Sequence, residues 1–299
     1  MLRISKEHVT DILDKNNVPA AYCCDGDTVV FETRDCYDGS ITSEERPYGD
    51  KPDPLENPAT GPLYINGAKP GDVLKVEILD IVVANQGIMR TSPTAGAFHE
   101  AYDTKTARIF PIVNEQVQFD DKLTLTIDPM IGVIGTAPSG EGILTETPDY
   151  HGGNMDCNKI VKGSTLYLPV GTEGALLSMG DLHALMGDGE VMICGLEISG
   201  EVTVRVSVLK NCILPTPFLV SRGKASTIQS AKTLDEAGKM AATKMFEFLS
   251  VVLHGNIVNA GMLMSLKSDM AVCQVVDPLK TVRVELPLEI FEAYGYQIP

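Results

Sequence analysis

Alternating apolar and polar residues predict β-strands through most of the first 215 residues. Val202, Val204, Val206 and Val208 all face one way, which predicts a half-buried strand over residues 200–208. β-Branched residues are enriched at 28–33, 73–81 and 123–127, and Gly- and Pro-containing turns separate these segments. Short strands at short intervals are typical of a β-sandwich or β-barrel.

Helical periodicity is confined to the C-terminal part of the chain. Residues 233–253 place apolar side chains on one face, with a Thr233/Glu236 capping box at the start and Gly255 at the end. A shorter helix is expected at 256–267, and the pattern returns to strand at 271–276 and 281–286.

These patterns predict a mainly β fold in two portions. Residues 1–215 form a sandwich- or barrel-like β body that carries the functional site, and residues 216–299 form a small α+β C-terminal portion packed on it as one compact unit. Residues 35–62 are rich in Asp, Glu, Pro and Gly without a period, which predicts a long functional or packing loop.

Composition narrows the classes of function. The chain has 24 Lys and Arg against 40 Asp and Glu, a net charge of −16 and a pI near 4.7. This balance argues against a nucleic-acid surface, which needs clustered cations. No apolar run approaches the length of a membrane span, and the N-terminal residues lack the apolar stretch of a secretion signal. Seven cysteines without a CxxC pair indicate reduced thiols, so we expect a cytoplasmic protein.

The segment 180–191 contains the richest set of chemically active side chains. Asp181 and His183 lie two residues apart, which puts them on one face of an extended segment, and such a pair commonly holds a divalent metal. Glu190 follows a Gly187-Asp188-Gly189 turn that could fold it back toward His183. The alternative is an ordinary β-hairpin in which these residues only shape the turn.

Two other segments contain candidate polar groups. Residues 150–157 hold two adjacent glycines followed by Asn154 and Asp156, which offer ligand oxygens or simply stabilise a Gly-Gly turn. Residues 92–99 form a small-residue loop that ends in His99, although a lone histidine is more often a hydrogen-bonded core residue. Cys157 could be a nucleophile, but its own segment shows no paired base, and Asp156 beside it should raise the pKa of the thiol.

Six segments in order resemble the acetamidase/formamidase family. They span residues 25–287, nearly the whole chain, and comprise 57–62 (NPATGP), 67–78 (GAKPGDVLKVEI), 129–138 (PMIGVIGTAP), 152–156 (GGNMD), 163–170 (GSTLYLPV) and 180–190 (GDLHALMGDGE). The resemblance implies a mainly β fold, a homodimer or higher homo-oligomer, and hydrolysis of short aliphatic amides such as formamide or acetamide to carboxylate and ammonia.

Amide hydrolysis needs a polarised carbonyl, a strong nucleophile and a proton for the leaving ammonia. A divalent metal supplies the first two. We therefore expect metal ligands at His183, Asp181, Asp156 and His99, a general base and then acid at Glu190, and a substrate hydrogen bond from Asn154. This mixed nitrogen and oxygen set suits zinc best, with manganese, iron or calcium as alternatives.

Two rival hypotheses remain open. One is a cysteine-dependent amidase that uses Cys157. The other is a non-catalytic family member that binds a metal or ligand without releasing ammonia.

Overall fold

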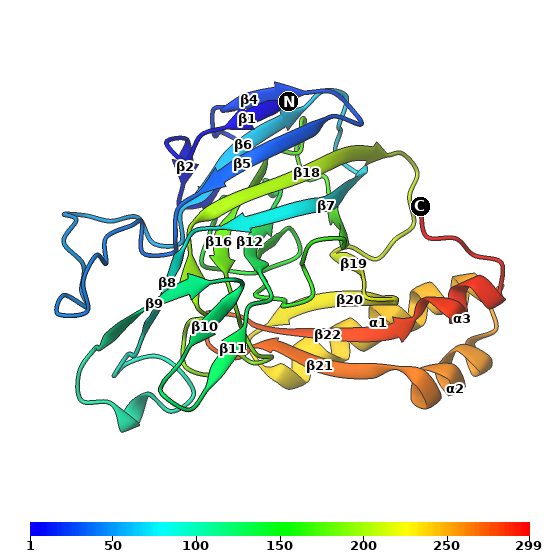
Figure 1. Cartoon of the computed structure of the whole chain (residues 1–299). Helices are drawn as coiled ribbons and strands as arrows, with labels where there is room; N and C mark the ends of the chain where they lie inside the picture. Colours follow the sequence, from blue (N-terminus) through cyan, green and yellow to red (C-terminus); the bar gives the residue numbers. More distant parts are fainter.

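The computed structural model describes all 299 residues and shows a mainly β fold (Figure 1). The larger part is a sandwich of two sheets, as the sequence predicts, and three α-helices follow in the last quarter of the chain. None of the helices has the length and apolar character that a membrane crossing requires.

The first sheet has nine strands and runs through both portions of the chain. In spatial order its strands are β1 (Leu2–Ile4), β5 (Thr28–Thr33), β18 (Gly200–Leu209), β7 (Val73–Val83), β15 (Thr165–Pro169), β19 (Phe218–Ser221), β20 (Lys224–Ala231), β22 (Lys280–Pro287) and β21 (Asp269–Gln274). Because β15 pairs with β19, strands from either side of residue 215 share one continuous sheet.

The second sheet has eleven strands and carries most of the site. They are β11 (Thr124–Thr126), β10 (Gln116–Gln118), β9 (Ala107–Val113), β8 (Gln86–Arg90), β17 (Glu197–Ile198), β16 (Leu177–His183), β12 (Met130–Gly135) and β14 (Gly152–Asn154), with β6 (Ala59–Ile65), β2 (Val9–Thr10) and β4 (Ala21–Cys23) joined through β6. A two-stranded sheet pairs β3 (Ile12–Leu13) with β13 (Ile143–Leu144). The long loop expected over 35–62 ends earlier, because β6 begins at Ala59 and pairs with β16.

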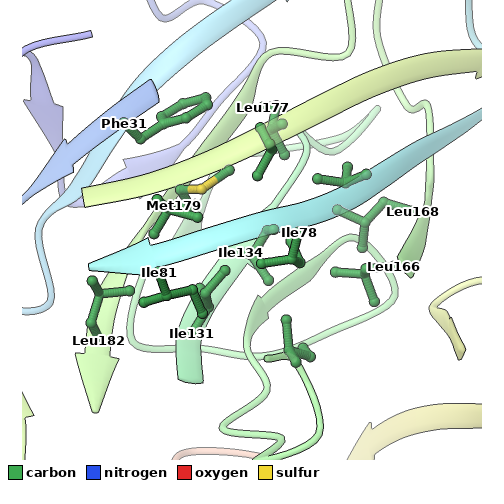
Figure 2. Packing of buried hydrophobic residues seen from close by; sticks show 14 of the residues in the cluster. Phe31, Ile78, Ile81, Ile131, Ile134, Leu166, Leu168, Leu177, Met179 and Leu182 are labelled. Carbon is green, nitrogen blue, oxygen red and sulfur yellow. The ribbon is translucent and has the colours of Figure 1, made fainter. Parts of the chain in front are cut away.

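The main core lies between the two sheets. Phe31, Ile78 and Val202 of the first sheet share one buried cluster with Ile131 and Leu182 of the second. Figure 2 shows these layers, with β7 and β18 in front of β12 and β16. The predicted face of β18 is confirmed: Val202, Val204 and Val206 are fully buried, and Val208 packs at the margin.

The helices cover the C-terminal end of the first sheet. They are α1 (Leu234–Val252), α2 (Ile257–Lys267) and α3 (Leu288–Ala293), with a single 3₁₀ turn, η1 (His99–Ala101), elsewhere. The Thr233 hydroxyl oxygen accepts a hydrogen bond from the backbone N–H of Glu236, as expected for the start of α1. Met245 and Phe248 of α1 pack on Phe218 and Leu286 in a second core. The predicted apolar face is correct except at Leu234, which is 38% exposed in the first turn.

Candidate metal and catalytic site

Four carboxylates surround one ring nitrogen of His183 at the end of β16. The distances from Nε2 are 3.0 Å to Glu197 Oε1, 3.4 Å to Asp181 Oδ1, 3.8 Å to Asp156 Oδ1 and 3.9 Å to Glu190 Oε1. All five side chains are almost completely buried. We call these five residues the His183 cluster.

The backbone aims three of these carboxylates by adopting unusual conformations. Asp156, Asp181 and Glu190 have φ values of 43°, 52° and 46°, in the left-handed region that residues with a Cβ rarely occupy. In the pairing of β12 with β16, Ile131 lies opposite Leu182 and Val133 opposite Gly180, while Asp181 leaves the ladder. Strained backbone of this kind concentrates at functional sites, where the surrounding structure holds it.

Two glycines leave space for the cluster. A Cβ on Gly132 of β12 would lie 2.5 Å from Asp181 Oδ2 and even closer to Asp156 Oδ1. A Cβ on Gly195 would lie 2.6 Å from Nδ1 of His183. Any other residue at either position would push a cluster side chain out of place.

Hydrogen bonding orients the His183 ring. Its Nδ1 lies 3.3 Å from the thioether sulfur of Met186, a weak acceptor, so Nδ1 carries the proton in the neutral ring. The lone pair of Nε2 then points to the carboxylates, where a metal ligand would need it.

Burial makes the charge of the cluster costly. It raises the pKa of Asp156 to about 7, helped by the charge of Asp181, and raises the pKa of Glu197 to about 8. Burial and the Asp156 charge place the pKa of Glu190 well above its usual range. Burial also opposes the ionisation of Asp181, but attraction to His183 outweighs it and lowers the Asp181 pKa. Burial likewise opposes the protonation of His183, but attraction to Glu197 and Asp181 outweighs it and raises the His183 pKa. A cation would balance this charge.

The unpaired polar atoms fit a divalent metal. Both oxygens of Asp156, Oε2 of Glu190, Oε2 of Glu197 and Nε2 of His183 are buried without a hydrogen-bond partner. One donor atom each from Asp156, His183 and Glu190 lies within 4.8 Å of the others, and Cys36, Asp181 and Glu197 form an adjoining group. Buried carboxylates are normally paired or bound to a metal, and this donor set suits zinc.

A cavity of about 480 Å³ opens onto the cluster. Asp181, Glu190 and Glu197 line it, together with Asn154, whose buried Oδ1 has no partner. Asp277, from the turn between β21 and β22, also lines it. Burial and the neighbouring Asp156 place the Asp277 pKa well above its usual range. The C-terminal portion therefore contributes an acid to a site otherwise built by the β body.

The structure brings together most of the predicted site residues. Asp156, Asp181, His183 and Glu190 form one cluster, and Asn154 lies in β14, two residues before Asp156. His99 lies apart from this group in η1, where its Nδ1 is 2.9 Å from the Gly96 carbonyl oxygen.

Sequence reasoning missed Glu197, Asp277 and Cys36. Glu197 stands alone in the apolar run from Cys194 to Ile198, and a single acid in a buried strand signals a required partner. No comparable local signal marks Asp277 or Cys36, because only the fold brings them to the cavity.

Cys157 contacts Cys273 and does not line the cavity. It is fully buried beside Cys273, and it is absent from the cavity lining that includes Cys36. The expected rise of its pKa is wrong: a hydrogen bond from Cys273 lowers the pKa of Cys157, burial opposes this, and the charge of Arg283 lowers it further. Two neighbours from the C-terminal portion thus outweigh the effect of burial.

Comparison with known proteins decides the family. A model of the acetamidase/formamidase family matches residues 15–146 and 140–293, almost the whole chain. The chain belongs to the acetamidase/formamidase family.

Two solved structures share the complete fold, and a curated relative matches part of its own length. The structure of an acetamidase from Bacillus halodurans is 49% identical, with a TM-score of 0.95 over 98% of this chain and 100% of that one. A predicted acetamidase/formamidase from Thermoanaerobacter tengcongensis is 40% identical, with a TM-score of 0.96 over 99% of both chains. A putative formamidase of Schizosaccharomyces pombe is 29% identical in an alignment 259 positions long that covers 66% of this chain and 63% of the relative. The match thus spans less than two thirds of that curated relative.

Proposed function

We propose that the protein hydrolyses short aliphatic amides to a carboxylate and ammonia at the His183 cluster, with a bound divalent metal, zinc first among the candidates. The observation that carries this proposal is the convergence of four buried carboxylates on Nε2 of His183, where Asp156, Glu190 and Glu197 have oxygens without a hydrogen-bond partner. The family and its named relatives support the amide as substrate.

The metal would be held by His183, Asp181 and Asp156, with Glu197 and Glu190 next to them. When bound, a divalent cation polarises a carbonyl group and acidifies water. The adjoining thiol of Cys36 makes the donor set softer, which favours zinc over calcium.

Glu190 is placed to move the proton. Its carboxyl group lines the cavity, and burial keeps its pKa well above the usual range. Such a carboxylate accepts a proton from the attacking water and returns it to the amide nitrogen as the C–N bond breaks. The oxygen of water remains on the acyl carbon, so the products are a carboxylate and ammonia.

Asn154 is placed to orient the substrate. Asn154 lines the cavity, and its Oδ1 is buried without a hydrogen-bond partner. This oxygen can therefore accept a hydrogen bond from the NH₂ group of the substrate. A buried acceptor that only an amide N–H satisfies would discriminate against the ester or acid of the same shape.

The test couples elemental analysis to ammonia release from C1–C4 amides, before and after chelation. We expect about one or two equivalents of metal per chain and activity that falls with its removal. His183→Ala should lose metal and activity, whereas the matched variant His99→Ala should keep its metal, since His99 lies outside the cluster. Activity that survives chelation and is abolished by iodoacetamide would establish the cysteine mechanism instead, and metal binding without ammonia release would identify a non-catalytic member.

A further inference from the structure

The lining of the cavity includes two cations that form no ion pair with an acidic side chain. Arg90, at the end of β8, and Lys105, in the following loop, both line it. Arg90 is the one arginine of the chain whose side chain makes neither an ion pair nor a hydrogen bond. Its Nε is buried and unpartnered. In a chain with 16 excess negative charges, an arginine whose side chain has no polar partner is unexpected.

Aromatic rings hold both cations in place. The Arg90 guanidinium carbon lies 4.5 Å from the centroid of the Tyr37 ring, and Lys105 Nζ lies 5.3 Å from the centroid of the Tyr48 ring. Both tyrosines line the same cavity. Stacking of this kind positions a cation while leaving its N–H donors available to a ligand.

The two cations repel each other. Burial lowers the pKa of Lys105, and the positive charge of Arg90 lowers it further, while Glu56 opposes both effects. Glu56 and Glu146 also line the cavity, and burial and the charge of Glu56 raise the pKa of Glu146. A ligand carboxylate would relieve the repulsion between Arg90 and Lys105.

The cavity is larger than the shortest amides require. At ~30 Å³ for a water-sized group, the four heavy atoms of acetamide occupy on the order of 100 Å³. The cavity holds about 480 Å³, which leaves room for a longer substrate between the His183 cluster and Arg90.

We propose that Arg90 and Lys105 form a carboxylate-binding subsite, and that the substrate is the monoamide of a short dicarboxylic acid. The amide end lies at the His183 cluster, and the carboxylate end lies against the two cations. The attraction between the substrate carboxylate and the two cations sets the orientation in which the substrate binds. This inference rests on the proposed amide hydrolysis for its reaction, but the subsite can be tested separately.

The kinetic test compares succinamate with butyramide, which have the same number of carbons. We expect kcat/KM to be at least about tenfold higher for succinamate, because one charge-assisted hydrogen bond supplies the free energy of a tenfold change. Arg90→Met should lower the succinamate-to-butyramide ratio about tenfold, mostly through KM, and Arg90→Lys should recover part of it. Lys105→Met serves as a second variant should Arg90→Met fold poorly. Lys122→Met, which removes an exposed cation outside the cavity, should leave the ratio unchanged.

A binding test separates the subsite from the reaction. Succinate should raise the Tm of the wild-type protein, and Arg90→Met should abolish this shift. If no amide is hydrolysed while this pattern holds, the proposed function fails and the subsite stands. If butyramide is hydrolysed as well as succinamate, and succinate shifts no Tm, the subsite is refuted and the proposed function stands.

Discussion

Replacing Gly132 by alanine tests whether the spacing between Asp156 and Asp181 creates the metal site. The new methyl group would lie 2.5 Å from Asp181 Oδ2, against 3.4–4 Å for ordinary contacts, and closer still to Asp156 Oδ1. It would also lie 2.8 Å from the Asp181 carbonyl oxygen. The two carboxylates or the two strands must therefore separate by about 1 Å.

A shift of this size has two measurable consequences. Metal–ligand distances tolerate only about ±0.2 Å, so we expect the metal affinity of Gly132→Ala to fall by about 10–100-fold. Overpacking should also lower the free energy of unfolding by about 1–3 kcal/mol. Competition with a chromophoric chelator measures the affinity, and urea unfolding of the metal-free protein measures the stability.

Gly171→Ala is the matched control. Its methyl group would lie 2.8 Å from the Ala137 carbonyl oxygen and from the Ser139 amide nitrogen, a comparable crowding with no cluster side chain among its nearest atoms. We expect a similar loss of stability with metal affinity unchanged. Wild-type affinity in Gly132→Ala, or an equal loss of affinity in both variants, would show that Gly132 does not set the carboxylate spacing.

Three further predictions follow from the site and its surroundings. Glu190→Gln should keep its metal while kcat falls by about 10²–10⁴, since the amide cannot accept a proton; loss of metal would make Glu190 a ligand. Cys157→Ala should change kcat less than tenfold, because the thiol faces Cys273 and not the cavity, and trapping of a thioester by hydroxylamine would contradict this. Burial lowers the pKa of His151 to about 4. Stability from its neutral form is therefore fully present above pH 6.5 and lost as pH falls toward 4, on the order of 3 kcal/mol in all. In His151→Phe that part of the pH dependence should vanish, and a difference in unfolding free energy from the wild type that stays constant between pH 4 and 6.5 would refute it.

Local patterns predicted the elements whose burial is regular. The alternating valines of β18 and the capping box of α1 each fix a face or an end within a few residues, and the structure agrees with both. The Asp181/His183 pair was visible for the same reason, because both belong to one strand. Local sequence was enough for these features, although Asp181 has a left-handed φ of 52° in place of the extended conformation expected for it.

The remaining part of the site depends on distant pairing. Glu197 reaches His183 because β17 lies beside β16, and Asp277 reaches Asp156 from more than a hundred residues later in the chain. The left-handed backbone at Asp156 and Glu190 also has no signature in residue type, since the tertiary structure holds it. His99 was expected to join the cluster but lies apart from it in η1. A loop of small residues next to a histidine gives no information about where that loop lies in the fold.

The continuous sheet has a consequence for how the protein is made. Strand β15 is synthesised before its neighbour β19, so roughly 50 residues must still be added before that edge is paired. At about 5–20 residues per second, a nascent chain leaves the Thr165–Pro169 edge open for about 3–10 s. An open apolar edge is a template for wrong pairing, so a polypeptide stopped at residue 215 should aggregate rather than persist as an independent body. Asp277 emerges later still, so a complete cavity lining is one of the last properties that the growing chain acquires.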